Sequence, residues 1–126
     1  MDCGPTCLRM IAKYYGKSFD LLHMKNISRI KNEGSSLLDI VDTAKKMGIK
    51  SKGLKIDIDF IKWIDLPVIL HWDCHHFVVL FKIRENTYFI ADPAIGILKL
   101  NTSDFLSHWQ NSESSDQKGI VLTVQL

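Results

Sequence analysis

The chain opens with the segment Asp-Cys-Gly-Pro-Thr-Cys-Leu-Arg-Met-Ile-Ala-Lys-Tyr-Tyr-Gly, residues 2–16. Its apolar residues recur at the three- and four-residue spacing of an amphipathic helix. Pro5 suits a first helical turn, where its missing N–H is harmless, and Gly16 suits a helix end. We therefore predict a helix over residues 5–15, with Cys3 at or just before its amino end.

This position gives Cys3 a chemical advantage. Unpaired backbone N–H groups and the helix dipole at a helix amino end stabilise an anion, and so favour a thiolate over a thiol. The same N–H groups can hold an oxyanion. Burial as a small packing residue is the alternative for Cys3. It is the favoured role for Cys7, which shares a face with the apolar stripe.

The bulk properties exclude several classes of protein. The 126 residues suit one domain, and 46% apolar with 24% charged residues indicate a globular chain. A formal net charge of +2 is too small to indicate nucleic acid or an anionic membrane as partner. No apolar run is long enough to span a membrane and no signal peptide is present, so we expect a cytosolic location. Three cysteines, an odd count, argue against a disulfide framework.

Working outward, the first half of the chain is helical in pattern and the second half is strand-like. Helices are predicted over about 20–30, from a Ser35 or Ser36 cap to Gly48, over part of 58–64, and from a Thr102 or Ser103 cap to Trp109. β-Branched and aromatic runs predict strands at 67–71, 76–83, 88–91, 97–100 and 120–124. This order indicates an α+β fold, with N-terminal helices packed on a C-terminal antiparallel β-sheet.

A thiolate needs a base, and two adjacent histidines open the longest predicted strand. His75 and His76 must point to opposite faces there, whereas His23 and His108 lie in polar helical stretches and are expected at the surface. The next strand ends at Asp92, the best candidate for an acid partner. Asp92 also precedes a proline, so a simple turn role is its alternative.

The loop between these two strands decides which histidine meets Asp92. A two-residue loop, 85–86, puts Asp92 on the face of His75. A three-residue loop, 84–86, puts Asp92 on the face of His76, and the asparagine at its last position tolerates the left-handed conformation that such a loop needs. We predict the three-residue loop, and therefore His76 as the base.

A zinc site is a rival use of the same side chains. Thiolates and imidazoles suit zinc, and candidate ligands are Cys74, His75 and His76 with Cys3 or Cys7. However, adjacent strand residues point apart, and the chain has no Cys-x-x-Cys and no helical His-Glu-x-x-His pattern. We therefore expect no metal.

Three blocks of sequence resemble a known family. They are residues 2–16, 71–80 and 90–96. They are similar to the double-glycine leader peptidase domain of bacterial peptidase-containing ABC transporters, a papain-like cysteine peptidase. The resemblance runs over nearly the whole chain. It implies that Cys3 is the nucleophile, His76 the base and Asp92 the acid that orients the base.

The resemblance also implies a task. Such thiol proteases cut a secreted precursor after a Gly-Gly or Gly-Ala pair that ends its leader, and the attached transporter exports the rest, as in bacteriocin processing. The expected partners are the leader peptide and the transmembrane and ATPase parts of the transporter, at the cytoplasmic side of the membrane. No cofactor is expected, since ATP would serve only the transporter part, and no nucleic acid.

One departure from the family bears on activity. The family has a glutamine six residues ahead of its nucleophile, which supplies an oxyanion-hole donor, whereas the printed sequence begins two residues ahead of Cys3. We therefore expect residues 1–126 to be a single, N-terminally truncated peptidase domain of a larger transporter, with weak activity. The alternative is a non-catalytic docking domain for transporter cargo, which the presence of Cys3 disfavours.

Overall fold

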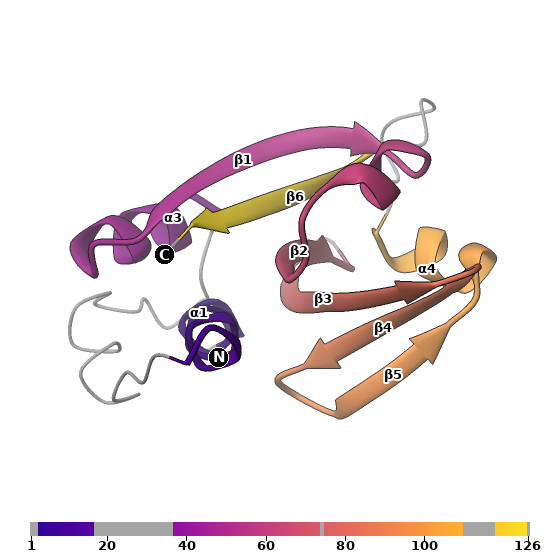
Figure 1. The fold of residues 1–126 in the computed structure, drawn as a ribbon, viewed down its shortest axis with the longest axis horizontal. Helices are drawn as coiled ribbons and strands as arrows, with labels where there is room; N and C mark the ends of the chain where they lie inside the picture. The colour runs from indigo at the N-terminus through magenta and orange to yellow at the C-terminus, as the bar shows by residue number, and fades with distance from the viewer. Residues whose placement is uncertain (1–2, 17–36, 74, 110–117, 126) are drawn as a thin grey trace.

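The computed structural model describes residues 3–16, 37–73, 75–109 and 118–125. Within these ranges it contains one six-stranded antiparallel sheet of order β1-β6-β2-β3-β4-β5 (Figure 1). Its elements are α1 (Cys3–Tyr14), α3 (Leu37–Lys46), β1 (Lys50–Asp57), the 3-10 helix η1 (Phe60–Trp63), β2 (Val68–Trp72), β3 (His76–Arg84), β4 (Thr87–Asp92), β5 (Gly96–Leu100), α4 (Thr102–Trp109) and β6 (Lys118–Gln125).

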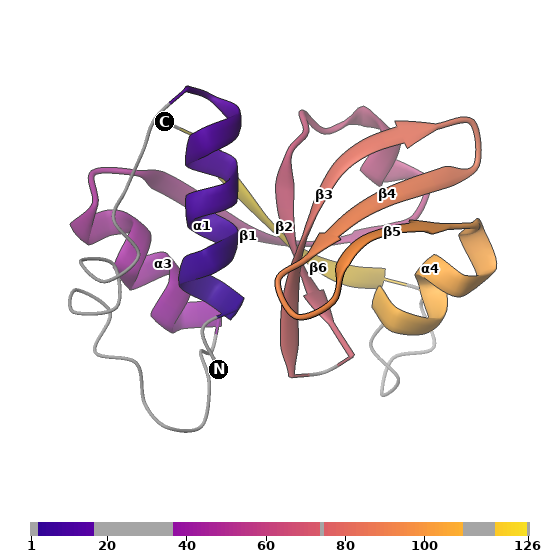
Figure 2. The same cartoon turned by 90° about the horizontal axis from the view of Figure 1, so that it is seen from below.

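Helices cover the sheet from two sides. Figures 1 and 2 show α1 and α3 together at one side and α4 at the other. Buried side chains accordingly form two clusters, one between the sheet and α1 with α3, the other between the sheet and α4 with η1. Residues that alternate along a strand, such as Phe77 and Val78 of β3, belong to different clusters. The predicted α+β architecture is therefore confirmed.

The first helix forms much as its sequence predicts. Its buried stripe contains Cys3, Cys7, Leu8 and Ile11. Gly16 follows the helix at φ 78°, a left-handed conformation that glycine adopts without a steric penalty. The helix includes Cys3, two residues earlier than predicted, so this cysteine occupies the first helical turn.

Five predicted strands are confirmed, and one strand was not predicted. The missed strand, β1, has only exposed and half-buried residues and contains three lysines, so it lacks the apolar run of a central strand. It lies at an edge of the sheet and pairs with β6. Such charged edge strands resist pairing with other chains.

The predicted cap of α4 needs correction, and two other local predictions lie outside the described residues. The cap of α4 is Asn101, whose Oδ1 accepts a hydrogen bond from the Asp104 N–H at 2.8 Å, and not Thr102 or Ser103. The chain turns one residue earlier than the serine and threonine pattern suggested. The predicted helix at about 20–30 and the caps at Ser35 or Ser36 lie outside the described residues.

The predicted three-residue loop between β3 and β4 is wrong. Arg84 pairs with Thr87, so the loop has two residues, and Glu85 rather than the asparagine adopts the left-handed conformation, with φ 58°. A β-bulge between Leu80 and Lys82 then shifts the register by one residue. Because a one-residue shift exchanges the two faces of a strand, the bulge undoes the effect of the shorter loop. From the bulge toward His76 and Asp92, the two strands therefore pair in the register that the three-residue loop predicts.

None of the helices in the described ranges is long and apolar enough to cross a membrane.

We predict that Gly119→Ala destabilises the fold, because a Cβ at this position of β6 would overlap the rigid indole of Trp109 in α4. Overpacking of this kind costs about 1–3 kcal/mol in the free energy of unfolding, which urea denaturation measures. Gly53→Ala on β1 is the matched control, since its Cβ would make an ordinary 3.4 Å contact with Leu37. Equal stability of the two variants would contradict the close contact between Trp109 of α4 and Gly119 of β6.

Candidate active site

The three residues predicted to carry chemistry come from three elements, and β3 contacts both of the others. Cys3 begins α1, His76 begins β3 and Asp92 ends β4. In Figure 2 the amino end of α1, the start of β3 and the β4–β5 turn lie on the same side of the molecule. The helix packs on the strand through its apolar stripe, and the thiol of Cys7 donates a weak hydrogen bond to the carbonyl oxygen of Phe77 at 3.4 Å.

Asp92 and His76 form a short hydrogen bond. The Nε2–H of His76 donates to Oδ1 of Asp92 at 2.6 Å, and only 17% and 6% of the two side chains are exposed. The same oxygen accepts the backbone N–H of Ala94 at 2.8 Å. The carboxylate is therefore fixed from two sides, and it serves as a turn residue and as a partner of the ring at once. Asp92 meets His76 and not His75, which is exposed.

The other ring nitrogen of His76 is the unusual atom of the site. Nδ1 is buried and has no hydrogen-bond partner among the described residues. Since Nε2 donates to the carboxylate, a neutral ring carries its lone pair on Nδ1. A buried polar atom without a partner costs free energy and needs an explanation. A nitrogen kept free to accept a proton is such an explanation.

The two described cysteines differ in their surroundings. Cys3 is 3% exposed, in the first turn of α1, where backbone N–H groups have no partner within the helix. Cys7 lies one turn further on and is fully buried. Burial raises the pKa of the Cys7 thiol well above its ordinary value, and the neighbouring Cys3 and Asp92 raise it further. Cys7 is therefore a protonated packing residue, as predicted.

The remaining candidate ligands and bases do not join this site. His108 is half-exposed, as expected, and hydrogen-bonds Asp73 instead. Within the described ranges, no three side chains of His, Cys, Asp or Glu gather as a metal site would require. Cys74, on which the zinc alternative depended, and His23 lie outside the described residues.

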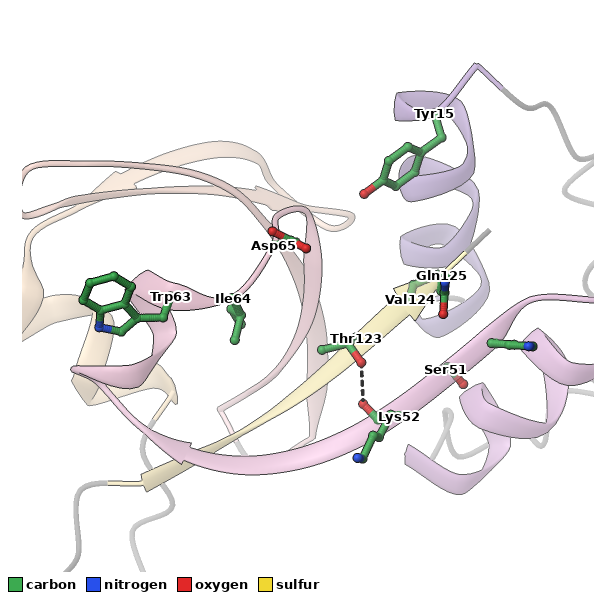
Figure 3. A pocket seen from close by; sticks show the side chains of 10 residues that line it. Tyr15, Ser51, Lys52, Trp63, Ile64, Asp65, Thr123, Val124 and Gln125 are labelled. Atoms are coloured by element: carbon green, nitrogen blue, oxygen red, sulfur yellow. Dashed lines mark hydrogen bonds between the residues drawn. The ribbon is translucent and has the colours of Figure 1, made fainter.

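A groove whose lining residues the sequence did not predict lies beside the carboxyl end of α1 (Figure 3). Its volume is about 680 Å³, and its lining residues are Tyr15, Lys50, Ser51, Lys52, Trp63, Ile64, Asp65, Thr123, Val124 and Gln125. The indole of Trp63 is 83% exposed, which is rare for so large an apolar side chain. The lining comes from four segments far apart in sequence, so no local pattern signals it.

Residues 1–113 match the Peptidase C39 family, and the chain belongs to this family of cysteine peptidases. It is 32% identical to the colicin V secretion/processing ATP-binding protein of Escherichia coli, over 89% of this chain and 17% of the relative. It is 36% identical to the probable microcin-H47 secretion/processing ATP-binding protein of Escherichia coli, over 75% of this chain and 14% of the relative. The chain thus spans about a sixth of the length of these relatives.

Solved structures agree with this assignment. A double glycine motif protease from an AMS/PCAT transporter, crystallised in complex with the leader peptide, superposes with a TM-score of 0.84 at 28% identity, covering 98% of this chain and 83% of that one. The peptidase domain of Streptococcus ComA, a bi-functional ABC transporter in a quorum sensing pathway, gives 0.83 at 25% identity, covering 98% and 90%. The papain-like peptidase fold predicted from the sequence is confirmed.

The raised pKa of Cys7 predicts its reactivity. Alkylation requires the thiolate, so iodoacetamide should modify Cys7 in the folded chain at pH 8 at least ~100-fold more slowly than in urea, as measured by mass spectrometry. The same shift lowers the free energy of unfolding as the pH rises above about 8.5, because the unfolded chain then releases a proton that the folded chain keeps. Rapid modification of Cys7 without unfolding would contradict its packing role.

Proposed function

We propose that this chain is the peptidase part of a peptide exporter and cuts the leader from a secreted precursor after a Gly-Gly or Gly-Ala pair. In this proposal Cys3 is the nucleophile, His76 the general base and acid, and Asp92 the residue that orients His76. The observation that carries it is the state of the His76 ring, with Nε2 bonded to Asp92 and Nδ1 buried and free.

The reaction begins with transfer of the Cys3 thiol proton to Nδ1 of His76. The sulfur then attacks the carbonyl carbon of the last leader residue, and the carbonyl oxygen becomes an oxyanion. Free N–H groups in the first turn of α1 stabilise that charge. Asp92 stabilises the imidazolium and holds the ring so that Nδ1, rather than Nε2, faces the reacting atoms.

In the second half of the reaction, His76 acts as the general acid. Nδ1–H of His76 protonates the leaving amine as the carbon–nitrogen bond breaks, which leaves the leader as a thioester on Cys3. A water molecule gives a proton to Nδ1 and attacks the thioester carbon. The carbon–sulfur bond then breaks and releases the leader acid, and Nδ1–H of His76 returns its proton to the sulfur, which restores the thiol. These steps use no cofactor and no metal.

The burial of Cys3 supports small residues at the cleavage point. Only 3% of this residue is exposed, so side chains beside the scissile bond must be small for the carbonyl carbon to reach the sulfur. The protease of the AMS/PCAT transporter, which is similar over nearly all of this chain, is a double glycine motif protease crystallised with a leader peptide.

We propose that the groove beside Trp63 holds the apolar face of the leader. α1 has 12 residues, so at the helical rise the groove near Tyr15 lies roughly 18 Å from Cys3. About three turns of a leader helix bridge that distance. Tyr15 and Trp63 offer apolar surface, and Lys50 and Lys52 favour acidic residues on the leader.

The transporter part belongs to the same proposal. The relatives are named as secretion and processing ATP-binding proteins, and the chain spans only a small share of them. We place this chain at the cytoplasmic face of a bacterial membrane, beside transmembrane and ATPase parts that would bind ATP and export the processed peptide.

Cleavage of a synthetic precursor with a double-glycine leader tests the catalytic roles. Cys3→Ala and His76→Ala should each abolish cleavage, and Asp92→Asn should lower kcat roughly 10²–10⁴-fold, because the ring loses its fixed tautomer. Cys7→Ala is the matched control and should retain most of the activity, since its buried thiol makes one weak hydrogen bond and takes no part in the reaction. A Cys3→Ala chain that still cuts would refute the proposal. A wild-type chain that binds the leader without cutting it would favour a docking domain.

The groove is tested by Trp63→Ala. Losing a large exposed ring from a leader-binding surface should raise KM about tenfold and leave kcat unchanged, since the ring lies far from the reacting atoms. Leu38→Ala is the control, because Leu38 is 68% exposed on α3, away from the groove. Equal KM values for both variants would place the leader elsewhere.

A further inference from the structure

A second histidine–aspartate pair lies outside the proposed catalytic residues. Nδ1–H of His108, in the last turn of α4, donates to Oδ1 of Asp73 at 2.6 Å. Asp73 follows β2 and begins the turn that leads into β3. The two side chains are 42% and 52% exposed, so an isolated pair of this kind contributes little to stability. The conformation of Asp73 and the packing of the His108 ring indicate a role other than stability.

Asp73 adopts a conformation that needs support. Its φ is 50°, in the left-handed region, which costs free energy for any residue with a Cβ, although aspartate tolerates it better than most. Two hydrogen bonds from one residue hold it there. The Asp73 N–H donates to the carbonyl oxygen of His108 at 2.8 Å, and the carboxylate accepts the His108 ring. His108 of α4 therefore fixes both the backbone and the side chain of Asp73.

The His108 ring is itself fixed against the core. It stacks on the indole of Trp72, with ring centroids 5.0 Å apart and planes 9° apart. Trp72 is buried, and its ring also contacts Phe105 of α4. The His108–Asp73 hydrogen bond is thus part of the packing between α4 and the sheet and not an isolated surface contact.

Asp73 lies three residues before the proposed base, His76, which begins β3. Trp72 lies opposite His76 in the β2–β3 ladder, and the His75 N–H donates to the Trp72 carbonyl at 3.3 Å. The backbone of Asp73 therefore helps set the direction in which the chain enters β3. A small rotation there moves the ring of His76 relative to Asp92 and the nucleophile.

We infer that His108 is a positioning residue for the peptidase reaction, which acts through Asp73 on the orientation of His76. The inference rests on the proposed function. His108 touches neither substrate nor the reacting atoms in this account, and its contribution is the geometry of the base. Displacements of about 1 Å at a catalytic group are known to lower rates up to 10²-fold.

Two variants of His108 separate the hydrogen bond from the ring stack. His108→Phe keeps a ring on Trp72 but removes the donor, and His108→Asn keeps a side-chain N–H in a similar place but removes the ring. We expect His108→Phe to lower kcat roughly tenfold at unchanged KM, and His108→Asn to stay within about threefold of the wild type. Asp73→Asn, which retains both the acceptor and the left-handed preference, should likewise be near the wild type, whereas Asp73→Ala should resemble His108→Phe.

A second readout needs no substrate. The rate of Cys3 alkylation by iodoacetamide at pH 7, mapped by mass spectrometry, depends on the base beside it. His108→Phe should lower this rate about tenfold, while urea unfolding and circular dichroism show the chain still folded at the assay temperature. An unchanged rate and kcat in His108→Phe would overturn the inference alone. A wild-type Cys3 no more reactive than a free thiol would overturn the proposed function, and the inference with it.

Discussion

The site depends on the hydrogen bond between Nε2 of His76 and Oδ1 of Asp92. This bond joins the first residue of β3 to the last residue of β4, so it forms only when the two strands are in the correct register. The bulge between Leu80 and Lys82 provides that register, because the two-residue loop alone would turn Asp92 to the opposite face. A single extra residue in β3, well away from the site, therefore decides which histidine meets the carboxylate.

The rest of the fold positions Cys3, the proposed nucleophile, relative to this pair. The apolar stripe of α1 buries the helix against β3, and the Cys7 thiol adds one weak hydrogen bond to the carbonyl oxygen of Phe77. On the other side of the sheet, α4 packs on β2 and β6 and holds the turn ahead of His76. The groove beside Trp63, which we propose for the leader, lies beside the carboxyl end of α1. In this proposal the leader-binding surface and the reacting atoms are separated by the length of one helix.

The sequence predicted what depends on local pattern. Helical spacing located α1 and Cys3, and apolar runs located β2 to β6. The predicted register selects His76 correctly but rests on a loop that is one residue too long. The actual loop is shorter and a bulge compensates for it, and nothing in the residues around Phe81 signals that bulge. β1 was missed because an exposed edge strand has no apolar run. The groove and the Asp73–His108 pair could not be predicted, because each joins segments that only the tertiary fold brings together.

The tautomer of His76 tests the central claim most directly. Nuclear magnetic resonance of ¹⁵N-histidine-labelled Cys3→Ala protein at pH 8 reports which ring nitrogen carries the proton, with the nucleophile's own proton removed from the problem. The account predicts a proton on Nε2 and a bare Nδ1, and loss of this preference in the Cys3→Ala, Asp92→Ala double variant. A proton on Nδ1 in the presence of Asp92 would contradict the hydrogen bond on which the proposed mechanism rests.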